Sequence, residues 1–351
     1  MELNMFLQPY NELRFTITLQ STSPLLIKES RYTDEDRKRW SNDRDDIKKR
    51  MPNVIPISRA SRPEIERAVL DPRDPLAAVG RLPFFLPASS LRGVFRSHLE
   101  RTLRSQDPPD QPRVCDPFED DLAASNVSCS KALAERRERF KAAFRPYRLS
   151  CPVCRLFGST LQAGRISFTD GERVEPSCGS LVQREHVRIN RRTGAVTGAP
   201  LKFYGLLEAK FRFEVKLRNF ELPHVMLMGV LLTDLKRGNI AIGSGRNKGY
   251  GRVRLSACSI QLAYLGLSAP PDELRGVAEH TDPGTREWFE RRYGVVSAAR
   301  AVALSRDGWQ SPFPWRHERE LDFSEFQELW PRLSLGWNRV PLLSGRLSAE
   351  A

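Results

Sequence analysis

The sequence predicts an α+β fold in which one sheet packs against two helices. Three segments alternate apolar and polar residues as half-buried strands do, and two segments repeat apolar residues at helical spacing. The strand segments are residues 13–19, 209–217 and 252–262, and the helical segments are residues 89–104 and 222–235. A doubly wound sheet needs a helix after nearly every strand, so this pattern favours an α+β layer.

Charge and composition point to a folded protein with an acidic partner. The 351 residues carry a formal net charge of +13, and 40% of them are hydrophobic, which is enough for the core of one large or two medium domains. A positive excess of this size suits a nucleic acid. Apolar runs near 18 residues and a signal peptide are both missing from the sequence, so we expect a cytoplasmic protein with no membrane contact.

The first strand is followed by a long charged segment. Residues 29–50 are dominated by charges, with few large apolar side chains besides Tyr32 and Trp40. Such a segment buries little surface, so we expect a mobile insertion or an exposed helix. Residues 59–81 continue as a charged connection interrupted by prolines.

The helical segment at residues 89–104 has one apolar and one basic face. Ser89 or Ser90 is suited to cap its start, where the helix terminus favours phosphate. We therefore expect Ser90, Arg92 and Arg96 to contact an RNA backbone.

Four of the six cysteines fall within forty residues, at Cys115, Cys129, Cys151 and Cys154. Cys151 and Cys154 form a CxxC pair, which is half of a tetrahedral thiolate site, so we predict that the four cysteines bind structural zinc. The spacing is wider than in ordinary zinc fingers, and His98 is an alternative ligand. A redox CxxC and buried structural thiols are the competing interpretations.

Residues 184–204 predict a protruding basic hairpin. An alternating strand leads into the turn at Thr193 and Gly194 and returns through residues 201–204. Its cations Arg188, Arg191 and Arg192 are expected RNA contacts. His186 lies at its base, where it is either a general base or a packed or RNA-contacting residue.

Residues 242–253 combine glycines with basic residues. Four glycines in nine residues permit positive φ and allow amides to face a phosphate. The spacing fits neither the dinucleotide fingerprint nor the P-loop, so a polyanionic chain is the expected ligand, and a solvated turn is the alternative. The expected contacts, with an aromatic ring for base stacking, are Gly243, Gly245, Arg246, Asn247, Lys248 and Tyr250.

The remaining residues, 266–351, begin with a linker at Pro270 and Pro271 and contain four of the six tryptophans beyond Gly294. The spaced aromatic residues suit a segment that docks on the body or on a partner subunit. A small helical satellite is the alternative.

Three features occur together in one order: Pro87-Ala88-Ser89-Ser90-Leu91-Arg92-Gly93, then Cys151-Pro-Val-Cys-Arg-Leu-Phe-Gly158, then the loop from Gly243 to Gly251. Over residues 13–260 the chain thereby resembles the RAMP superfamily of CRISPR-associated proteins, and within it the backbone subunits of type III effector complexes. The resemblance implies a modified ferredoxin-like (RRM-like) palm with a β-hairpin thumb and charged insertions.

The resemblance also implies a division of the chain. Residues 1–28, 82–106 and 155–265 form the RAMP core. Residues 29–81 are an expanded loop between the first strand and the first helix, residues 107–154 are the cysteine-containing insertion, and residues 266–351 are a C-terminal extension.

The function implied by the resemblance is that of a subunit that stacks head to tail with like subunits along a crRNA, together with other CRISPR effector subunits. Residues 187–203 would be the thumb that wedges between guide and target RNA bases. Arg92 and the glycine loop would hold the guide backbone, which positions RNA without reading its sequence.

In such subunits an acidic residue in the expanded loop supports metal-dependent cleavage of target RNA by the adjacent 2′-hydroxyl. Asp46 and Asp45 are the candidates here, with magnesium as the cofactor, and Asp34 and Asp36 follow. Residues 50–53 occupy the place of the acid in a compact alignment, so enzymatic activity is left undecided. The alternatives are a standalone repeat-processing endoribonuclease, a catalytically silent scaffold, and an unrelated basic zinc-ribbon RNA-binding protein.

Overall fold

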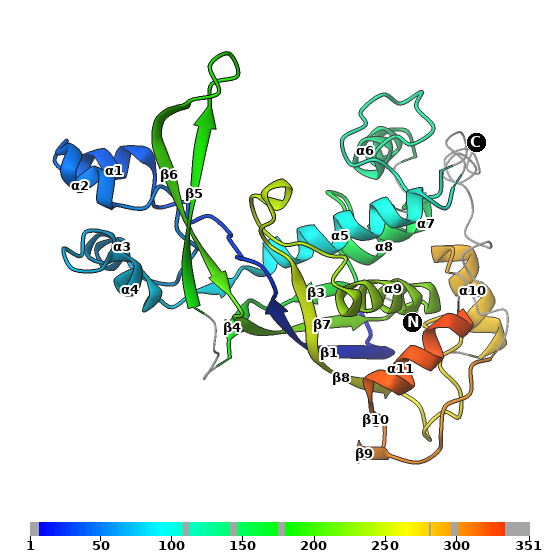
Figure 1. Ribbon diagram of the computed structural model, residues 1–351. Helices are drawn as coiled ribbons and strands as arrows, with labels where there is room; N and C mark the ends of the chain where they lie inside the picture. The colour runs from blue at the N-terminus through cyan, green and yellow to red at the C-terminus, as the bar shows by residue number, and fades with distance from the viewer. Residues whose placement is uncertain are drawn as a thin grey trace.

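The computed structural model describes residues 7–107, 112–140, 146–174, 180–280, 282–295 and 301–333. Its centre is an antiparallel eight-stranded sheet in the order β2-β4-β7-β1-β8-β10-β9, with β3 also paired to β7 (Figure 1). The strands are β1 (Asn11–Ser21), β2 (Phe85–Leu86), β3 (Ile166–Phe168), β4 (Gly171–Arg173), β7 (Lys210–Arg218), β8 (Val253–Leu265), β9 (Trp309–Phe313) and β10 (Arg316–Leu321).

The central strand β1 alternates as the sequence predicts. Its apolar side chains Leu13, Phe15, Ile17 and Leu19 are buried, and the residues between them lie on the opposite face. β1 pairs with β7 on one side and β8 on the other, with a register shift beside Thr18. The mixed α+β architecture with an antiparallel sheet is therefore confirmed.

Two long helices cover one face of the sheet, α5 (Ala88–Arg104) and α9 (Leu222–Arg237) (Figure 1). The predicted apolar face of α5 is buried at Leu91, Phe95 and Leu99. The predicted serine cap is wrong: Pro87 is the N-cap residue and makes no side-chain cap.

The charged segment after β1 folds into four short helices, α1 (Asp34–Trp40), α2 (Asp45–Arg50), α3 (Arg62–Val69) and α4 (Pro75–Gly80). The expectation that this segment buries little surface is wrong. Tyr32 and Trp40 stack with ring centroids 5.7 Å apart, and both are buried with Met51 and Ile55. A few large apolar residues at helix ends therefore suffice to attach the segment to the core.

The predicted hairpin is a separate two-stranded sheet, β5 (Ser180–Ile189) and β6 (Val196–Leu207). It projects away from the main sheet in Figure 1, with α1 to α4 on one side of it. The Asn190 amide donates to the Ala195 carbonyl at 2.8 Å, and Gly194 has a φ of 70°, which closes the predicted turn. The middle of β6 is held by two hydrogen bonds, in which the Asn53 amide donates to the Lys202 carbonyl and the Lys202 amide donates to Asn53 Oδ1, both at 2.7 Å.

The cysteine-containing insertion has three short helices, α6 (Cys129–Phe140), α7 (Pro146–Leu149) and α8 (Pro152–Phe157). Residues 141–145, between α6 and α7, lie outside the described part of the chain. All six residues of α8 are buried. In the described ranges, none of the helices combines the length and the apolar character that crossing a membrane requires.

The described part of the C-terminal extension joins the body instead of forming a separate tail. β10 pairs with β8 along six residues, and after it α11 (Phe323–Leu329) packs Phe326 against Phe15 at a centroid distance of 5.5 Å. Before β9, α10 (Pro283–Tyr293) builds a small second core with Tyr10. Trp337 lies outside the described residues.

Candidate nucleic-acid interface and metal centre

The four clustered cysteines meet in one buried site. The sulfur atoms of Cys115, Cys129, Cys151 and Cys154 all lie within 4.8 Å of one another, and Cys115 Sγ is 3.6 Å from both Cys151 Sγ and Cys154 Sγ. Four thiolates around a zinc ion at about 2.3 Å would stand about 3.8 Å apart. The cluster could therefore bind a metal such as zinc, as the residue types predicted.

Local backbone geometry prepares this cluster for negative charge. The amide of Cys151 donates to Cys129 Sγ at 3.3 Å, and the amide of Cys154 donates to Cys151 Sγ at 3.4 Å. Burial by itself raises the pKa of Cys151, but hydrogen bonds from the other cysteine side chains lower that pKa well below its usual value. The same contacts raise the pKa of Cys129 and Cys154, so the negative charge is centred on Cys151. A thiolate is the form of cysteine that ligates metals.

Arg96 lies beside the cysteine cluster. Its guanidinium donates to Cys154 Sγ at 3.2 Å, to Glu100 Oε1 at 2.8 Å and to the Gly158 carbonyl at 3.1 Å. Burial opposes the charged form, but Cys154 and Glu100 raise the pKa of Arg96 above its ordinary value. A tetrathiolate zinc site has an excess of two negative charges, and Arg96 offsets part of it.

The neighbouring predicted contacts differ in their availability. Arg92 is exposed and also donates to the Phe157 carbonyl, whereas all three guanidinium nitrogens of Arg96 have partners inside the protein. Ser90 is half-buried in the first turn of α5. The RNA contacts predicted for Ser90 and Arg92 stay predictions, and Arg96 is placed as a support of the cysteine cluster.

His98 is not part of the cysteine cluster, although it was an alternative ligand. Its Nε2 lies 2.7 Å from Asp234 Oδ2, a contact that joins α5 to α9. The CxxC pair does open a short helix, but Cys115 and Cys129 complete a four-thiol group and the clustered thiols are all free. This arrangement favours the metal interpretation over the redox one.

The glycine loop adopts the predicted positive φ at all four glycines, Gly243, Gly245, Gly249 and Gly251. A Cβ on Gly243 would lie 2.3 Å from the Leu26 carbonyl oxygen, so this glycine allows close packing within the chain. The loop includes a 3₁₀ turn at Arg246–Lys248.

Several amides of this loop bond within the chain, and the phosphate contact predicted for the other amides stays a prediction. The Ser244 amide donates to the Leu26 carbonyl at 2.7 Å, the Gly251 amide to Pro24 at 2.9 Å, and the Lys248 amide to Gly245 at 2.8 Å. These donors are therefore occupied. The exposed side chains of Arg246, Asn247 and Lys248 are further groups that can reach a ligand.

Tyr250 connects the glycine loop to the hairpin. Its ring is 2% exposed, so the expected stacking face is covered. Its hydroxyl and His186 Nε2 are 2.9 Å apart, in a hydrogen bond, and Lys248 Nζ lies 5.7 Å from the centre of the Phe203 ring. The glycine loop and the hairpin thus meet at His186 and Phe203 and form one continuous surface, which we call the loop–hairpin surface.

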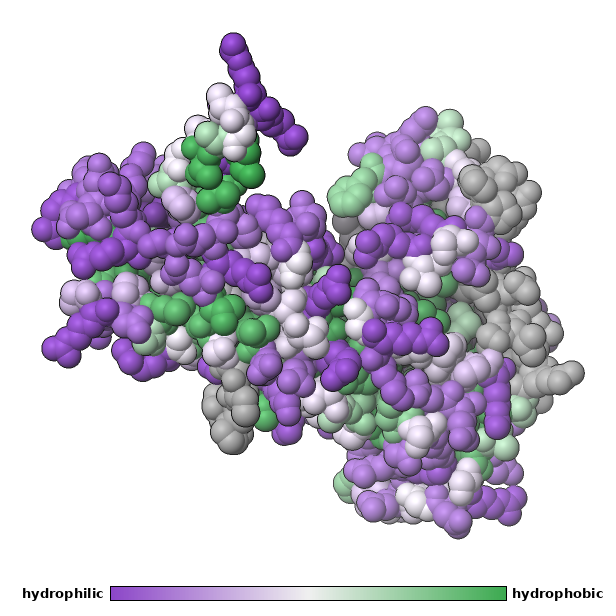
Figure 2. Space-filling view, in the orientation of Figure 1, coloured by the Kyte–Doolittle hydropathy of each residue, from purple (hydrophilic) through white to green (hydrophobic). Residues whose placement is uncertain are grey.

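An apolar strip on the hairpin was not recognised in the sequence. Its members are exposed, Ile189 by 62%, and Ile189 faces Val196 across the two strands. The strip consists of Val187, Ile189, Val196 and Leu201. Figure 2 shows hydrophobic surface gathered on the hairpin below a hydrophilic tip. The alternation of apolar and polar residues in a hairpin predicted to protrude was a usable signal, because apolar side chains on a strand without a cover stay exposed.

His186 lies within the loop–hairpin surface. Burial lowers its pKa, and the positive charges of Lys248 and Arg184 lower it further. The imidazole is therefore neutral at pH 7. Arg188, Arg191 and Arg192 are exposed along the same hairpin, as predicted from their position around the turn.

The candidate catalytic acids lie beside the hairpin. Asp45 and Asp46 are exposed in the first turn of α2, and α2 is attached to β6 where Lys202 Nζ donates to the Lys49 carbonyl at 2.9 Å. Asp36 instead forms a capping box with Thr33 and pairs with Arg62, so it has a structural task. Asp34 pairs with Arg37 at 3.2 Å.

Comparison with known proteins now adds the family. A family model described as the RAMP superfamily matches residues 78–254, half of the chain, and this span contains α5, the cysteine cluster, the hairpin and the glycine loop. A search of curated proteins gave no match. Because the matched span covers half of the 351 residues and holds every part of the loop–hairpin surface, the chain belongs to the RAMP superfamily.

Proposed function

We propose that the chain is a crRNA-binding backbone subunit of a type III CRISPR effector complex, which positions guide and target RNA. The observation that carries the proposal is the hydrogen bond between Tyr250 and His186, because it joins the glycine loop to the hairpin. The cations of Arg246 and Lys248 then continue into Arg184 and those along the hairpin. A continuous basic surface holds a phosphate backbone irrespective of sequence.

The sheet supports a ferredoxin-like palm. The strands β4, β7, β1 and β8 are neighbours in that order, with α5 between β1 and the β3–β4 pair and α9 between β7 and β8 in the chain. This is the arrangement of a split β-α-β fold. On β1 and β7 the residues that face solvent are charged or polar, and they offer no aromatic ring on which an RNA base could stack. The RNA surface we propose is therefore the loop–hairpin surface and not the open sheet. The solvent-facing residues are Glu12, Arg14, Thr16, Arg212, Glu214, Lys216 and Arg218.

The hairpin is suited to act as a thumb. Apolar side chains inserted between bases separate the base steps, while nearby arginines hold the phosphates. The apolar strip and the cations Arg188, Arg191 and Arg192 provide both functions on one ribbon. We assign the strip to contact with bases of the guide–target duplex, and head-to-tail neighbours would continue the groove.

A cleavage activity would rest on Asp45 and Asp46. Carboxylate oxygens are the ligands that Mg²⁺ takes in proteins. Among the described residues neither aspartate is in an ion pair, and both project from the helix attached to the hairpin. They would hold the ion, which stabilises charge on a phosphate, or accept the proton of the 2′-hydroxyl.

The RNA surface is tested with the double variant Arg246→Gln, Lys248→Gln. Guide RNA affinity should fall about equally for unrelated sequences, and the slope of log K against log salt should shrink by about 0.7 per lost phosphate contact. The measurement is a binding titration at several salt concentrations. The matched control, Lys131→Gln with Arg291→Gln, removes two exposed cations elsewhere and should keep most of the slope. A sequence-dependent loss, or equal losses in both doubles, would refute the backbone contact.

Cleavage is tested with the double variant Asp45→Asn, Asp46→Asn in the assembled complex. Guide-matched RNA should be cut in the presence of Mg²⁺ by the wild type and be cut at least about a hundredfold more slowly by the double variant. Asp34→Asn is the control, since it leaves both candidates in place. Unchanged cleavage in the double variant would remove the assignment, and a wild type that never cuts would identify a catalytically silent scaffold.

A standalone repeat-processing ribonuclease is the second candidate, and one observation favours it. Of the five histidines, His186 is the one beside the loop–hairpin surface, it is neutral at pH 7, and it touches the Tyr250 hydroxyl. Such a base could act without a metal ion. Cutting of repeat RNA by the isolated chain in EDTA, lost in His186→Gln, would establish this candidate in place of the first.

A further inference from the structure

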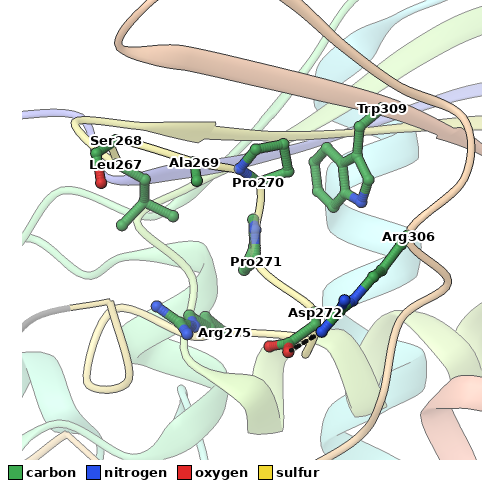
Figure 3. Close-up of a pocket in the computed structure, with 9 residues that line it drawn as sticks. All are labelled: Leu267, Ser268, Ala269, Pro270, Pro271, Asp272, Arg275, Arg306 and Trp309. Carbon is green, nitrogen blue, oxygen red and sulfur yellow. Dashed lines mark hydrogen bonds and ion pairs between the residues drawn. The ribbon is translucent and has the colours of Figure 1, made fainter.

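A pocket of about 510 Å³ lies between the chain that follows β8 and the chain that leads into β9. Figure 3 shows the residues that line it, from Leu267 to Asp272, with Arg275, Arg306 and Trp309. Its volume lies within the range of small-molecule sites. It also lies outside residues 78–254 and is separate from the loop–hairpin surface.

One side of this pocket is apolar and rigid. The ring of Pro270 lies beside the indole of Trp309 in Figure 3, and Pro271 follows it along the wall. Trp309 Nε1 donates to the Ser305 carbonyl at 3.2 Å, and the indole packs near Tyr264 at a centroid distance of 5.9 Å. An indole fixed in this way can receive a planar ring without ordering first.

The other side of the pocket carries two guanidinium groups in long ion pairs. Arg306 Nη2 lies 3.4 Å from Asp272 Oδ2, and Arg275 Nε lies 3.4 Å from Glu273 Oε1. The Arg306 side chain is 85% exposed, so its pair contributes little to stability. Arg306 can therefore turn to a phosphate, to which a guanidinium donates two parallel hydrogen bonds, and the less exposed Arg275 lines the pocket beside it.

Tyr264 places the two sides relative to each other. Its ring lies near Trp309, and its hydroxyl is 2.6 Å from the Arg275 amide nitrogen, in a hydrogen bond that the amide donates. The tyrosine is fully buried, and it lies in β8, the strand that β10 joins. The spacing between the indole and the Arg275 backbone is therefore set by the sheet.

We propose that this pocket binds one unpaired nucleotide, with its base against Trp309 and the prolines and its phosphate on Arg275 and Arg306. An apolar ligand alone would leave the two guanidinium groups unused, and a lone phosphate would leave the indole unused. The nucleotide can come from a free mononucleotide or from a single-stranded stretch of RNA. The inference stands on the pocket and does not require the function proposed above.

The first arm of the test titrates the full chain with adenosine 5′-monophosphate, adenosine and inorganic phosphate by calorimetry. Adenosine 5′-monophosphate should bind most tightly of the three. Trp309→Leu should weaken both the nucleotide and adenosine about tenfold, because it removes the stacking face, whereas Trp309→Phe should retain most of the binding. Arg306→Gln should weaken the nucleotide about fivefold and leave adenosine unchanged.

The second arm uses a short single-stranded RNA that carries one 2-aminopurine, whose fluorescence is quenched by stacking. Quenching that is lost in Trp309→Leu, with no binding of the free nucleotide, identifies RNA as the source. Thermal unfolding checks that each variant is folded. If Trp309→Leu is unfolded, the proposal is tested with Arg306→Gln alone. Ligand binding that is absent in the wild type in both arms, or that is unaffected by both variants, overturns the proposal.

Discussion

The cysteine cluster and the loop–hairpin surface are both assembled from distant segments, but they differ in burial and in how their charges are paired. Each brings together segments that are distant in the sequence, through contacts to backbone and side chains. The cysteine cluster is closed to solvent: its four sulfur atoms are buried, and the positive charge of Arg96 pairs with them inside the protein. The loop–hairpin surface is open, and among the described residues Arg246 and Lys248 have no acidic partner in an ion pair.

This difference separates stability from binding. Charges that are satisfied inside a protein contribute to folding and are little affected by salt, whereas unpaired exposed cations contribute to binding and are strongly affected by it. A chelator should therefore act on the cysteine cluster, acid on other buried ionisable groups, and salt on the loop–hairpin surface. The expected effect of a substitution on stability should therefore be largest at buried, charged groups and smallest at the exposed surface.

The largest effect is expected from loss of the metal site. Cys151→Ser removes a thiolate from the cluster, whereas the serine hydroxyl can still cap α8 in place of the sulfur. Metal binding in structural zinc sites is worth on the order of 10 kcal/mol. We expect loss of bound metal and a large fall in unfolding temperature, measured by elemental analysis and differential scanning calorimetry. A strong chelator should reproduce the effect in the wild type.

Cys258→Ser is the matched control for the cysteine variant, since Cys258 lies outside the cluster on β8. It should retain the metal and the unfolding temperature. If Cys151→Ser left both unchanged, the four cysteines would be buried structural thiols and the comparison between a closed and an open region would lose its basis.

Acid should have the next largest effect, through His224 at the start of α9. Burial lowers its pKa to about 4, and Arg155 and Arg165 act in the same direction against Glu221. In the unfolded chain the imidazole titrates near 6.5, so between pH 6.5 and 4 the unfolded state binds the proton and the folded state does not. The free energy of unfolding should fall over this window by about 3 kcal/mol on account of this residue.

The measurement compares denaturant unfolding of the wild type and His224→Gln at several pH values. The variant should show a flatter dependence in the stated window. His186→Gln is the comparison from the open region, and because His186 is only half-buried, its effect on the pH dependence should be smaller. If both variants flattened the pH dependence of the unfolding free energy equally, burial of the histidine would not explain the difference between the two regions.

The periodicity of single segments was sufficient to predict the strands and helices, but it was insufficient to predict which residues contact each other. The alternation over residues 13–19 and the apolar run at 222–235 predicted β1 and α9, and the residue types of the four cysteines predicted their cluster. The burial of Trp40 depends on Tyr32 across a turn, and that of Tyr250 depends on the hairpin. Such partners lie elsewhere in the chain, and no local pattern identifies them.

The smallest effect, and the finest test of the comparison, is expected from Tyr250→Phe. It removes the hydrogen bond to His186 and keeps the ring, so stability should change by no more than about 1 kcal/mol. Metal content should stay the same, and amide hydrogen exchange around His186 and Leu201, where β5 and β6 pair, should become faster. Guide RNA affinity should fall by less than about fivefold with an unchanged salt slope, because no cation is lost. A changed slope would mean that the tyrosine acts through the cations themselves, and unchanged exchange would mean that the loop does not hold the hairpin in place.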